Sequence, residues 1–388
     1  MDALTTPSNW QRVRLGDILE LLTDYHANGS YELLKNNVTL LKHVDFAIMI
    51  RTTNFENNDF KNDLIYINKK AYEFLSKSKV FAGDILVNKI ANSGTAYFMP
   101  KLNQPVSLGM NLFLLRIKPN YNNFFIFKQI ANYERILKTF ANGSATKTIT
   151  KNVIKNLLIP LPPLNEQIAI ADILSALDRY LHALRALILK KESVKKALSF
   201  ELLSQRKRLK GFNQAWQKVR LGDICNYLTS NLSAEQITQQ GKIKVYDVNN
   251  FIGYTDTTFI SDKPYISIVK DGSVGRVRIL PPKTNVLSTM GALIANHKTT
   301  TEFLFYLLSN FDFKNFTSGS IIPHIYFKDY KEKTIFLPPL NEQSAIAGIL
   351  STLDKEIASL KNKKRQFENI KKALNHDLMS AKIRVLKK

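Results

Sequence analysis

The feature that most constrains the fold of this chain is an internal duplication. Residues 10–18 read WQRVRLGDI and residues 216–224 read WQKVRLGDI, so that only the third position differs. A second pair, LPPLNEQ, occupies residues 161–167 and 337–343, and AIA and IL follow it at the same spacing in both places. Repeats of this kind mark architectures in which one unit is built more than once. The sequence therefore predicts two related halves.

The segment between the two motifs differs between the copies. The first motif pair is offset by 206 residues and the second by 176, so the intervening segment is 30 residues shorter in the second copy. The shorter offset also aligns a Gly-Ser pair at 143–144 with 319–320, and KKAL at 195–198 with 371–374. Each copy thus consists of an entry motif, a variable globular segment, a predicted Gly-Ser turn, and a Pro-Pro pair followed by a helix.

Each Pro-Pro pair is predicted to lead into one long helix. Asn165 and Asn341 are the predicted N-caps, with a glutamate in each first turn where the helix dipole favours negative charge. No Pro or Gly interrupts residues 165–210, so a helix of roughly 40 residues would run about 60 Å. Apolar residues recur at alternating spacings of four and three, which indicates a coiled-coil seam. The seam residues are Ile170, Leu174, Leu177, Leu181, Leu184 and Ile188 in the first copy, and Ile346, Leu350, Leu353, Ile357 and Leu360 in the second.

Two equal helices in one chain that must return between two domains are expected to pack antiparallel. The Trp10 segment would then lie beside the end of the second helix, as Trp216 lies beside the end of the first. Beyond Ile188 the heptad drifts, because Lys191 stands where the second copy has Phe367. The basic run over residues 190–208 is interpreted first as a solvated helix face, with partner or phosphate contacts as the alternative.

The variable segments predict an α+β fold, with two globular α/β domains separated by the two antiparallel helices. Their strand-like runs are rich in β-branched and aromatic residues; they lie at 39–41, 84–87, 112–117, 265–269 and 274–280. The predicted division is a first recognition domain at 1–150, a first spacer-helix region at 151–212, a second recognition domain at 213–326 and a second spacer-helix region at 327–388.

The charge of the chain points to an anionic partner. Lys and Arg number 55 against 32 Asp and Glu, a formal net charge of +23, which nucleic acid would balance most directly. A membrane surface is the second candidate, but no apolar run of about 18 residues is present and residues 1–10 do not resemble a signal peptide. We therefore expect a cytoplasmic protein without a membrane partner. The single cysteine, Cys225, is expected to be a small buried hydrophobe.

Candidate DNA contacts come from glycine turns that carry basic or amide side chains, at residues 89–95 and 270–276. Such turns let the backbone approach DNA closely and donate hydrogen bonds to phosphates or base edges; plain surface hairpins are the alternative for each turn taken alone. Lys147 and His324 are added because they follow the two Gly-Ser turns, with solvated turn residues as the alternative. The full set of candidates is Lys42, Lys89, Asn92, Thr95, Lys147, Tyr246, Asn249, Lys270, Ser273, Arg276 and His324.

No catalytic motif is found in the sequence. The phosphate-binding GxxxxGK[ST] loop, GxGxxG, HExxH, GxSxG and the Asn-Pro-Pro-Tyr of amino-methyltransferases are all missing, and the six histidines lack metal-ligand spacing. We expect neither a catalytic nor a metal site. Two alternatives stay open: a DNA-processing nuclease built on acidic residues such as Asp45, Asp84 or Asp247, and a structural coiled-coil adaptor that does not bind DNA.

The duplicated LPPLNEQ–AIA–IL helix start, paired with WQxVRLGDI, resembles the specificity subunit of type I restriction-modification enzymes over essentially the whole chain. The resemblance implies two recognition domains that each read one half of a split DNA site, and paired helices that fix the spacer. It also implies docking of two methylation subunits and assembly with restriction subunits, which would hold S-adenosylmethionine, ATP and Mg²⁺, whereas this chain would hold no cofactor. The candidate partner contacts at the helix starts are Asn165, Glu166, Gln167, Asn341, Glu342 and Gln343.

Overall fold

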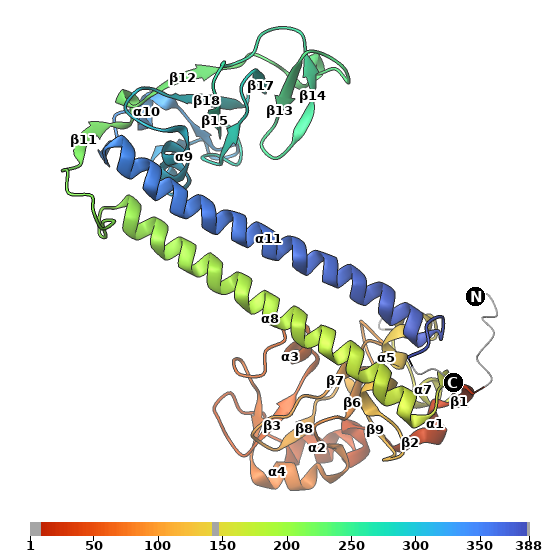
Figure 1. The fold of residues 1–388 in the computed structure, drawn as a ribbon. Coiled ribbons are helices and arrows are strands. Elements are labelled where there is room, and N and C mark those ends of the chain that lie inside the picture. The colour runs from red at the N-terminus through yellow and green to blue at the C-terminus, as the bar shows by residue number, and fades with distance from the viewer. Residues whose placement is uncertain (1–8, 142–146, 386–388) are drawn as a thin grey trace. The chain divides into compact units, whose positions relative to one another are not determined.

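The structure is a computed structural model that describes residues 9–141 and 147–385 (Figure 1). The chain forms two compact units: residues 1–182 together with 365–388, and residues 183–364. Each unit holds one globular domain and one segment of each long helix. The domain boundaries predicted at 150, 212 and 326 remain predictions; residues 151–161 pack into the core of the first domain before the long helix begins.

The first domain contains two four-stranded sheets. One has the order β2–β9–β6–β7 and the other β4–β3–β8–β5, in which the β3–β8 pair is parallel. The strands are β2 (Leu19–Asp24), β3 (Ala47–Ile50), β4 (Tyr66–Ile67), β5 (Lys79–Val80), β6 (Ile85–Asn88), β7 (Ala96–Phe98), β8 (Val106–Leu108) and β9 (Leu112–Ile117). The helices are η1 (Tyr25–Asn28), α2 (Tyr31–Asn37), α3 (Thr52–Glu56), α4 (Lys69–Phe74), η2 (Ser76–Ser78), α5 (Asn123–Asn132), α6 (Glu134–Thr139) and α7 (Lys151–Lys155).

The second domain repeats the first of these sheets, with the order β12–β18–β15–β16, and adds a three-stranded sheet β14–β13–β17 and a small hairpin β19–β20. The strands are β12 (Cys225–Thr229), β13 (Ile243–Tyr246), β14 (Phe251–Thr255), β15 (Tyr265–Val269), β16 (Val277–Leu280), β17 (Thr284–Val286), β18 (Met290–Ala295), β19 (Thr317–Ser318) and β20 (His324–Ile325). The helices are η4 (Ala234–Gln236), α9 (Thr301–Ser309), η5 (Lys314–Phe316) and α10 (Phe327–Tyr330).

The predicted strands at 84–87, 112–117 and 265–269 are confirmed as β6, β9 and β15, whose apolar runs are almost entirely buried. Two strand predictions were wrong. Residues 39–41 make only an isolated bridge, between Leu41 and Tyr66. Of 274–280, only the last four residues form a strand, because Gly275 takes a φ of 79° and the three residues before Val277 belong to the turn.

The duplicated motifs meet in space within each domain. The entry strand β1 (Gln11–Arg14) pairs antiparallel with β10 (Leu158–Leu161), which ends just before the first Pro-Pro pair. Likewise β11 (Gln217–Arg220) pairs with β21 (Thr334–Leu337). A short helical turn follows each entry strand: α1 (Leu15–Ile18) and η3 (Leu221–Asp223). The two motifs therefore close each domain and lead directly into the long helix.

The two long helices are α8 (Leu164–Leu203) and α11 (Leu340–Met379), each of 40 residues, as the sequence predicted. The predicted N-caps need correction, since Asn165 and Asn341 lie inside the first turn. The carbonyl oxygen of Pro163 accepts the first helical bond, from the backbone N–H of Gln167 at 3.0 Å, and Pro339 does the same for Gln343 at 2.9 Å. The helices therefore start at Leu164 and Leu340, one residue before each asparagine.

In both units the segments of α8 and α11 pack antiparallel. In the first unit Tyr180 packs on Phe367 with ring centroids 4.7 Å apart, and Asp178 forms an ion pair with Lys371. In the second unit Lys191 bonds Glu356 at 2.6 Å. The predicted seam is confirmed, because every seam residue is buried or partly buried. The drift beyond Ile188 has a local cause. Lys191, the counterpart of Phe367 in the first copy, forms an ion pair with Glu356, whereas Phe367 packs on the Tyr180 ring.

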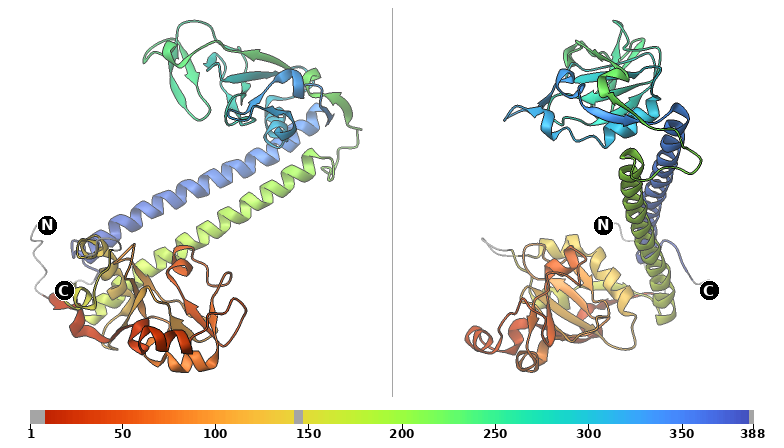
Figure 2. Two further views of the ribbon diagram at one scale, coloured as in Figure 1. Left: turned by 180° about the vertical axis from the view of Figure 1, so that it is seen from behind. Right: turned by 90° about the vertical axis from the view of Figure 1, so that its left-hand side faces the viewer.

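The predicted placement of the entry segments is confirmed as well. In the first unit Trp10 lies in one core cluster with Ile170 near the start of α8 and with Leu378 and Met379 at the end of α11. In the second unit Trp216 shares a cluster with Leu202 at the end of α8. Figures 1 and 2 show β1 beside the start of α8 and the end of α11.

Candidate nucleic-acid interface

The two glycine turns singled out in the sequence are built alike. The first joins β6 to β7 and the second joins β15 to β16. Gly94 and Gly275 both have positive φ, 88° and 79°, and each donates its N–H across the turn, to Asn88 at 2.8 Å and to Val269 at 2.9 Å. A side chain at either glycine would collide with Leu137 or Phe313. Only glycine fits there, so both domains present the same rigid turn.

In the first domain the polar side chains of this turn are tied to acidic residues. The Lys89 ammonium lies 3.0 Å from Asp24, and the Thr95 hydroxyl donates to Glu134 at 2.8 Å. Asn92 reaches Glu56 at 3.5 Å. The predicted contact residues are therefore brought together, but their charge and hydrogen-bonding capacity are largely used inside the protein.

Asp24 is the centre of this first cluster. Lys151 also bonds it, at 3.1 Å, so one carboxylate serves two ammonium groups. Burial raises the pKa of Asp24, but the hydrogen bonds and charges of Lys89 and Lys151 outweigh burial, so its pKa lies below the usual 3.8. Together the three groups carry a net charge of +1 beside a hollow lined by Ile90, Phe113 and residues 148–152.

In the second domain the same turn is more open. Lys270 and Ser273 make no side-chain hydrogen bond or ion pair with any residue that the structure describes. Arg276 donates to the side chain of Asn249 at 2.7 Å, and both residues are exposed. Because its cations are not held by carboxylates, they are more available to an anionic ligand than the cations of the first turn.

A second loop lies against this turn. Arg278 donates to the carbonyl oxygen of Asn249 at 2.9 Å, and its guanidinium lies over the Tyr246 ring at 5.3 Å. The loop between β13 and β14 is thus joined to β16, and the structure gathers the predicted residues Tyr246, Asn249 and Arg276 in one place. Sequence reasoning missed Arg278, although it follows Arg276 at the spacing that puts both on one face of a strand.

His324 lies beside the second turn through Asp271, whose carboxylate is 2.6 Å from its Nδ1. In the first domain, Lys147 is exposed and its carbonyl oxygen accepts a bond from Ser93, within the glycine turn. Lys42 is exposed on a separate bend, and no contact among the described residues joins it to that turn. The predicted turn at Gly143–Ser144 lies outside the described residues, whereas Gly319–Ser320 forms the end of the β19–β20 hairpin.

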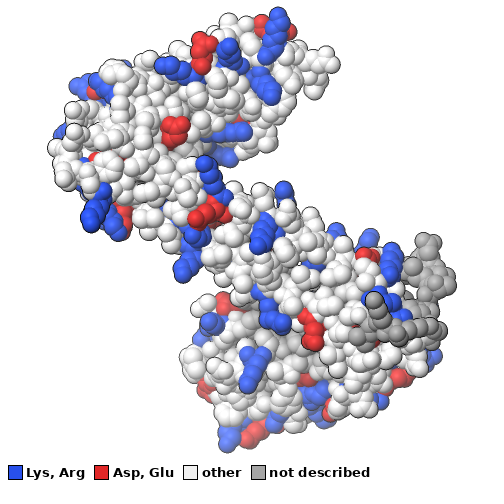
Figure 3. Space-filling view, viewed as in Figure 1, with Lys and Arg blue, Asp and Glu red and all other residues white. Residues whose placement is uncertain are grey.

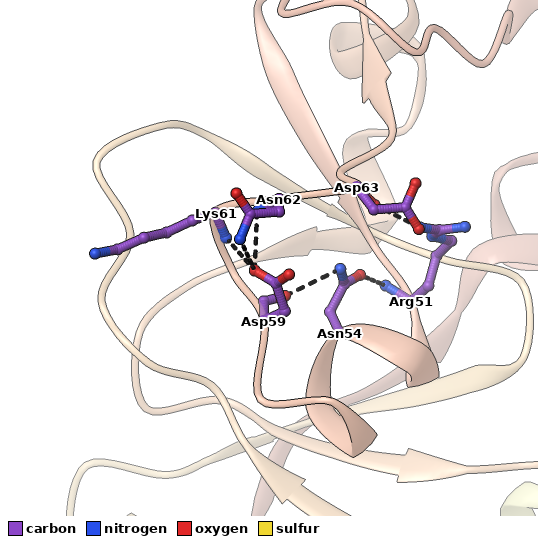
Figure 4. A network of polar contacts seen from close by, with 6 residues as sticks. All are labelled: Arg51, Asn54, Asp59, Lys61, Asn62 and Asp63. Carbon is purple, nitrogen blue, oxygen red and sulfur yellow. Dashed lines mark hydrogen bonds and ion pairs between the residues drawn. The ribbon is translucent and has the colours of Figure 1, made fainter. Parts of the chain in front are cut away.

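The first domain also holds a polar network that sequence reasoning missed (Figure 4). Its members are Arg51, Asn54, Asp59, Lys61, Asn62 and Asp63. The Asp59 carboxylate accepts from the backbone N–H groups of Asn62 at 2.8 Å and Lys61 at 2.9 Å, and these bonds lower its pKa. The Lys61 side chain extends away from the network, so the loop is ordered while its cation stays exposed.

The helix-start residues predicted to contact partners remain a prediction, and the structure shows that most of them make bonds inside the fold. In the second unit Glu342 is fully buried and accepts a bond from the Trp216 indole at 3.0 Å and from Arg208 at 2.6 Å. In the first unit Glu166 is 2% exposed and accepts from Trp10 at 3.3 Å and Arg384 at 2.7 Å. Both glutamates thus join the entry motif to the segment that follows the other helix.

The adjacent glutamines are also used inside the fold. The Gln167 side-chain oxygen accepts the backbone N–H of Asn122 at 2.9 Å, and Gln343 accepts that of Thr300 at 2.9 Å. These bonds attach α8 and α11 to the N-termini of α5 and α9. Of the six predicted partner contacts, only Asn165 and Asn341 are exposed.

One aspartate on each long helix further attaches the domain. Asp178 lies between Lys128 of α5, at 3.0 Å, and Lys371 of α11. In the second unit Asp354 accepts from the Tyr306 hydroxyl of α9 at 2.8 Å and bonds Lys195 of α8. Burial lowers the pKa of Lys128, and for Asp178 burial is outweighed by the two lysines, which lower its pKa.

The carboxylates considered for a nuclease do not converge. Asp84 is buried in a two-point bond with Arg116, at 2.8 and 2.9 Å, Asp247 accepts two backbone N–H groups of its own loop, and Asp45 accepts that of Phe46. In residues 9–141 and 147–385, no three His, Cys, Asp or Glu side chains form a group suited to a metal ion. Within that same part, no helix is long and apolar enough to cross a bilayer.

On the face shown in Figure 3, Lys and Arg are more frequent than Asp and Glu. The fold and this surface define a class of protein: a duplicated chain in which one basic recognition module occurs twice, each copy attached to a long helix.

Sequence comparison places the chain within that class. Residues 7–191 and 213–369 both match the family described as "Type I restriction modification DNA specificity domain". The chain therefore belongs to the type I restriction-modification DNA specificity family and contains its domain twice.

Relatives agree with this assignment, and one solved structure shares the fold. The chain is 30% identical to the "Putative type I restriction enzyme MjaX specificity subunit" of Methanocaldococcus jannaschii, over 97% of each sequence. It is 25% identical to the MjaVIII specificity subunit of the same organism, over 99% of this chain and 95% of that one. A crystal structure of a type I S subunit from M. genitalium is similar in fold, with a TM-score of 0.63 at 20% identity, covering 95% of this chain and 96% of that one.

Proposed function

We propose that this chain is the non-catalytic DNA-reading subunit of a type I restriction-modification enzyme, and that each domain reads one half of a split, asymmetric site in double-stranded DNA. The observation that carries the proposal is the glycine turn, built identically in both domains but bearing different side chains. If both domains approach DNA with the same backbone turn, the different side chains on that turn can contact two different base sequences.

The long helices set the distance between the half-sites in this proposal. A 40-residue helix is roughly 60 Å long, which corresponds to about 18 base pairs at about 3.4 Å each. That span accommodates two major-groove contacts one to two helical turns apart. The buried glutamate and glutamine of each LPPLNEQ motif keep the domains attached to the helices, so the spacing is set by helix length.

Partners supply the chemistry. We propose that two methylation subunits dock on the helices and that restriction subunits join them, bringing S-adenosylmethionine, ATP and Mg²⁺. Exposed apolar side chains on the helices support a protein-binding role; among them are Ile168, Leu187, Leu189 and Val194. The net charge of +23 supplies affinity for phosphates that falls with salt.

The proposal is tested by co-purifying the chain with the methylation subunit of its own locus and mapping methylated adenines in DNA treated with that complex. A split, asymmetric motif is expected. Shortening both helices by a few residues should change the spacer and leave both half-sites intact. Absence of a complex and of methylation, or an unchanged spacer, would contradict the proposal.

A further inference from the structure

The hairpin β19–β20 ends in a turn that exposes two isoleucines. Residues 319–323 read GSIIP, and Ile321 and Ile322 are 92% and 55% exposed. Gly319 has a φ of 89°, and a Cβ at this position would collide with the carbonyl oxygen of Ile322. The turn is therefore closed tightly, and its apolar side chains face solvent. Adjacent exposed apolar side chains with polar surroundings are typical of interaction sites.

The turn is fixed to the glycine turn of the same domain. The N–H of Gly272 donates to the carbonyl oxygen of Pro323 at 2.8 Å, and the N–H of Ile325 donates to Lys270 at 2.9 Å. The His324–Asp271 contact at 2.6 Å adds a side-chain link. The hairpin end and the glycine turn thus form one rigid element.

Basic side chains flank the hairpin on both sides. One arm borders a hollow whose lining includes Arg276, Lys314 and Thr317. The other arm borders a hollow whose lining includes Lys270, Ile325, Lys328 and Lys331. The carboxylate at the base of the hairpin, Asp271, is taken up by His324. The exposed isoleucines at the hairpin turn thus lie between two groups of basic side chains. This arrangement is complementary to a DNA groove, in which the base edges lie between two phosphate backbones.

We propose that Ile321 and Ile322 contact thymine methyl groups in the major groove of the half-site read by the second domain; this rests on the proposed function above. The major groove, about 12 Å wide, admits a two-stranded ribbon such as β19–β20, and thymine exposes its C5-methyl group there. The minor groove, about 6 Å wide, exposes no thymine methyl group, so it offers the isoleucines no such contact. The flanking lysines and arginine reach the phosphates on either side.

The first copy differs at these positions. At the offset of 176 residues, Ala145 and Thr146 stand where the second copy has Ile321 and Ile322. The large apolar pair is thus specific to one copy, as expected of residues that determine one half-site and not the other.

The test uses the complex with its methylation subunits and duplexes that carry the mapped methylation motif, with single thymines replaced by deoxyuridine. Removal of one buried methyl group should weaken binding about fourfold at one or two positions of the second half-site. The Ile321→Ala/Ile322→Ala variant should bind the thymine duplex about tenfold more weakly and lose nothing further with deoxyuridine. Leu228→Ala is the matched control, since Leu228 is an exposed apolar residue of the same domain and should behave as wild type.

Two outcomes would overturn the inference alone: a mapped motif with no deoxyuridine effect in the second half-site, or equal deoxyuridine losses in wild type and variant. A rise in the fluorescence of 2-aminopurine placed in the second half-site, seen with wild type and not with the isoleucine variant, would also overturn the inference, because it would show that the isoleucines insert between bases. Absence of any methylated motif would instead contradict the proposed function itself, and the inference with it.

Discussion

The buried Glu342 provides a quantitative test of how the duplicated motifs hold each unit together. Its carboxylate is fully buried and accepts the indole N–H of Trp216 at 3.0 Å. Glu342→Ala would leave that buried N–H without its acceptor, at about 1–3 kcal/mol, and remove the buried Cγ methylene, at about 0.8 kcal/mol. Arg208 is part-exposed and can turn to water. We expect the free energy of unfolding of the second unit to fall by about 3 kcal/mol.

Urea unfolding followed by tryptophan fluorescence measures this change. The chain has two tryptophans, one in each unit, so a Trp10→Phe background leaves Trp216 as the reporter of the second unit. With a denaturant slope of about 3 kcal/mol per molar, the midpoint should fall by about 1 M.

Glu332→Ala is the matched control, because Glu332 also pairs with an arginine but both partners are exposed. Its loss should stay below about 1 kcal/mol. Equal shifts for Glu342→Ala and Glu332→Ala would refute the reasoning that the buried glutamate fastens the unit.

Three further predictions concern stability and reactivity. The pKa of Asp24 is lowered by its two lysines, so its stabilising contribution is present above pH 3.8 and is lost as the pH falls through the lower folded pKa. Asp24→Asn should remove that part of the pH dependence from an acid unfolding curve. An acid unfolding curve identical to that of the wild type would contradict this prediction. Burial raises the pKa of Cys225 to about 12, so at pH 8 the native thiol should react with Ellman's reagent only after urea unfolding, and rapid native labelling would count against its burial. Leu350 is fully buried in the core of the second unit, so Leu350→Ala should cost about 3 kcal/mol in the same urea assay; a loss below 1 kcal/mol would argue against that packing.

Much of the fold could be predicted because the duplication repeats the sequence pattern of the entry strand and of the long helix. The long helices and their seam followed from apolar spacing over 40 residues, where local pattern and packing agree. The start of each helix was misplaced because Asn165 is a favourable cap by residue type, whereas the carbonyl oxygen of Pro163 takes the first helical bond. Residue preference alone does not distinguish these two starts.

The role of the LPPLNEQ glutamates could not be predicted from their own neighbourhood. A first-turn glutamate is favoured at any helix N-terminus. The buried Glu166, however, is paired with Arg384, which lies 218 residues later in the chain. A signal was nevertheless present, since Arg208 and Arg384 are related by the same offset of 176 as the motifs. Duplicated long-range partners can thus be found by applying the repeat offset to charged residues.

The candidate DNA contacts were predicted in part. Glycine turns with basic side chains were recognised, but sequence alone did not reveal that Asp24 binds Lys89 and Lys151, since these residues are far apart in the chain. Nor did it reveal the exposure of Ile321, because isoleucine at a turn is more often buried than not. Charge pairing and exposure are properties of packing, which local pattern does not encode.

The central claim, that each domain reads its own half-site, is tested most directly by exchanging residues 225–326 for the corresponding segment of a family member with a different mapped target. The hybrid, purified with its methylation subunit, would be assayed by mapping methylated adenines. The account predicts that one half of the motif changes while the other half and the spacer stay the same. A change in both halves, or in neither, would contradict it.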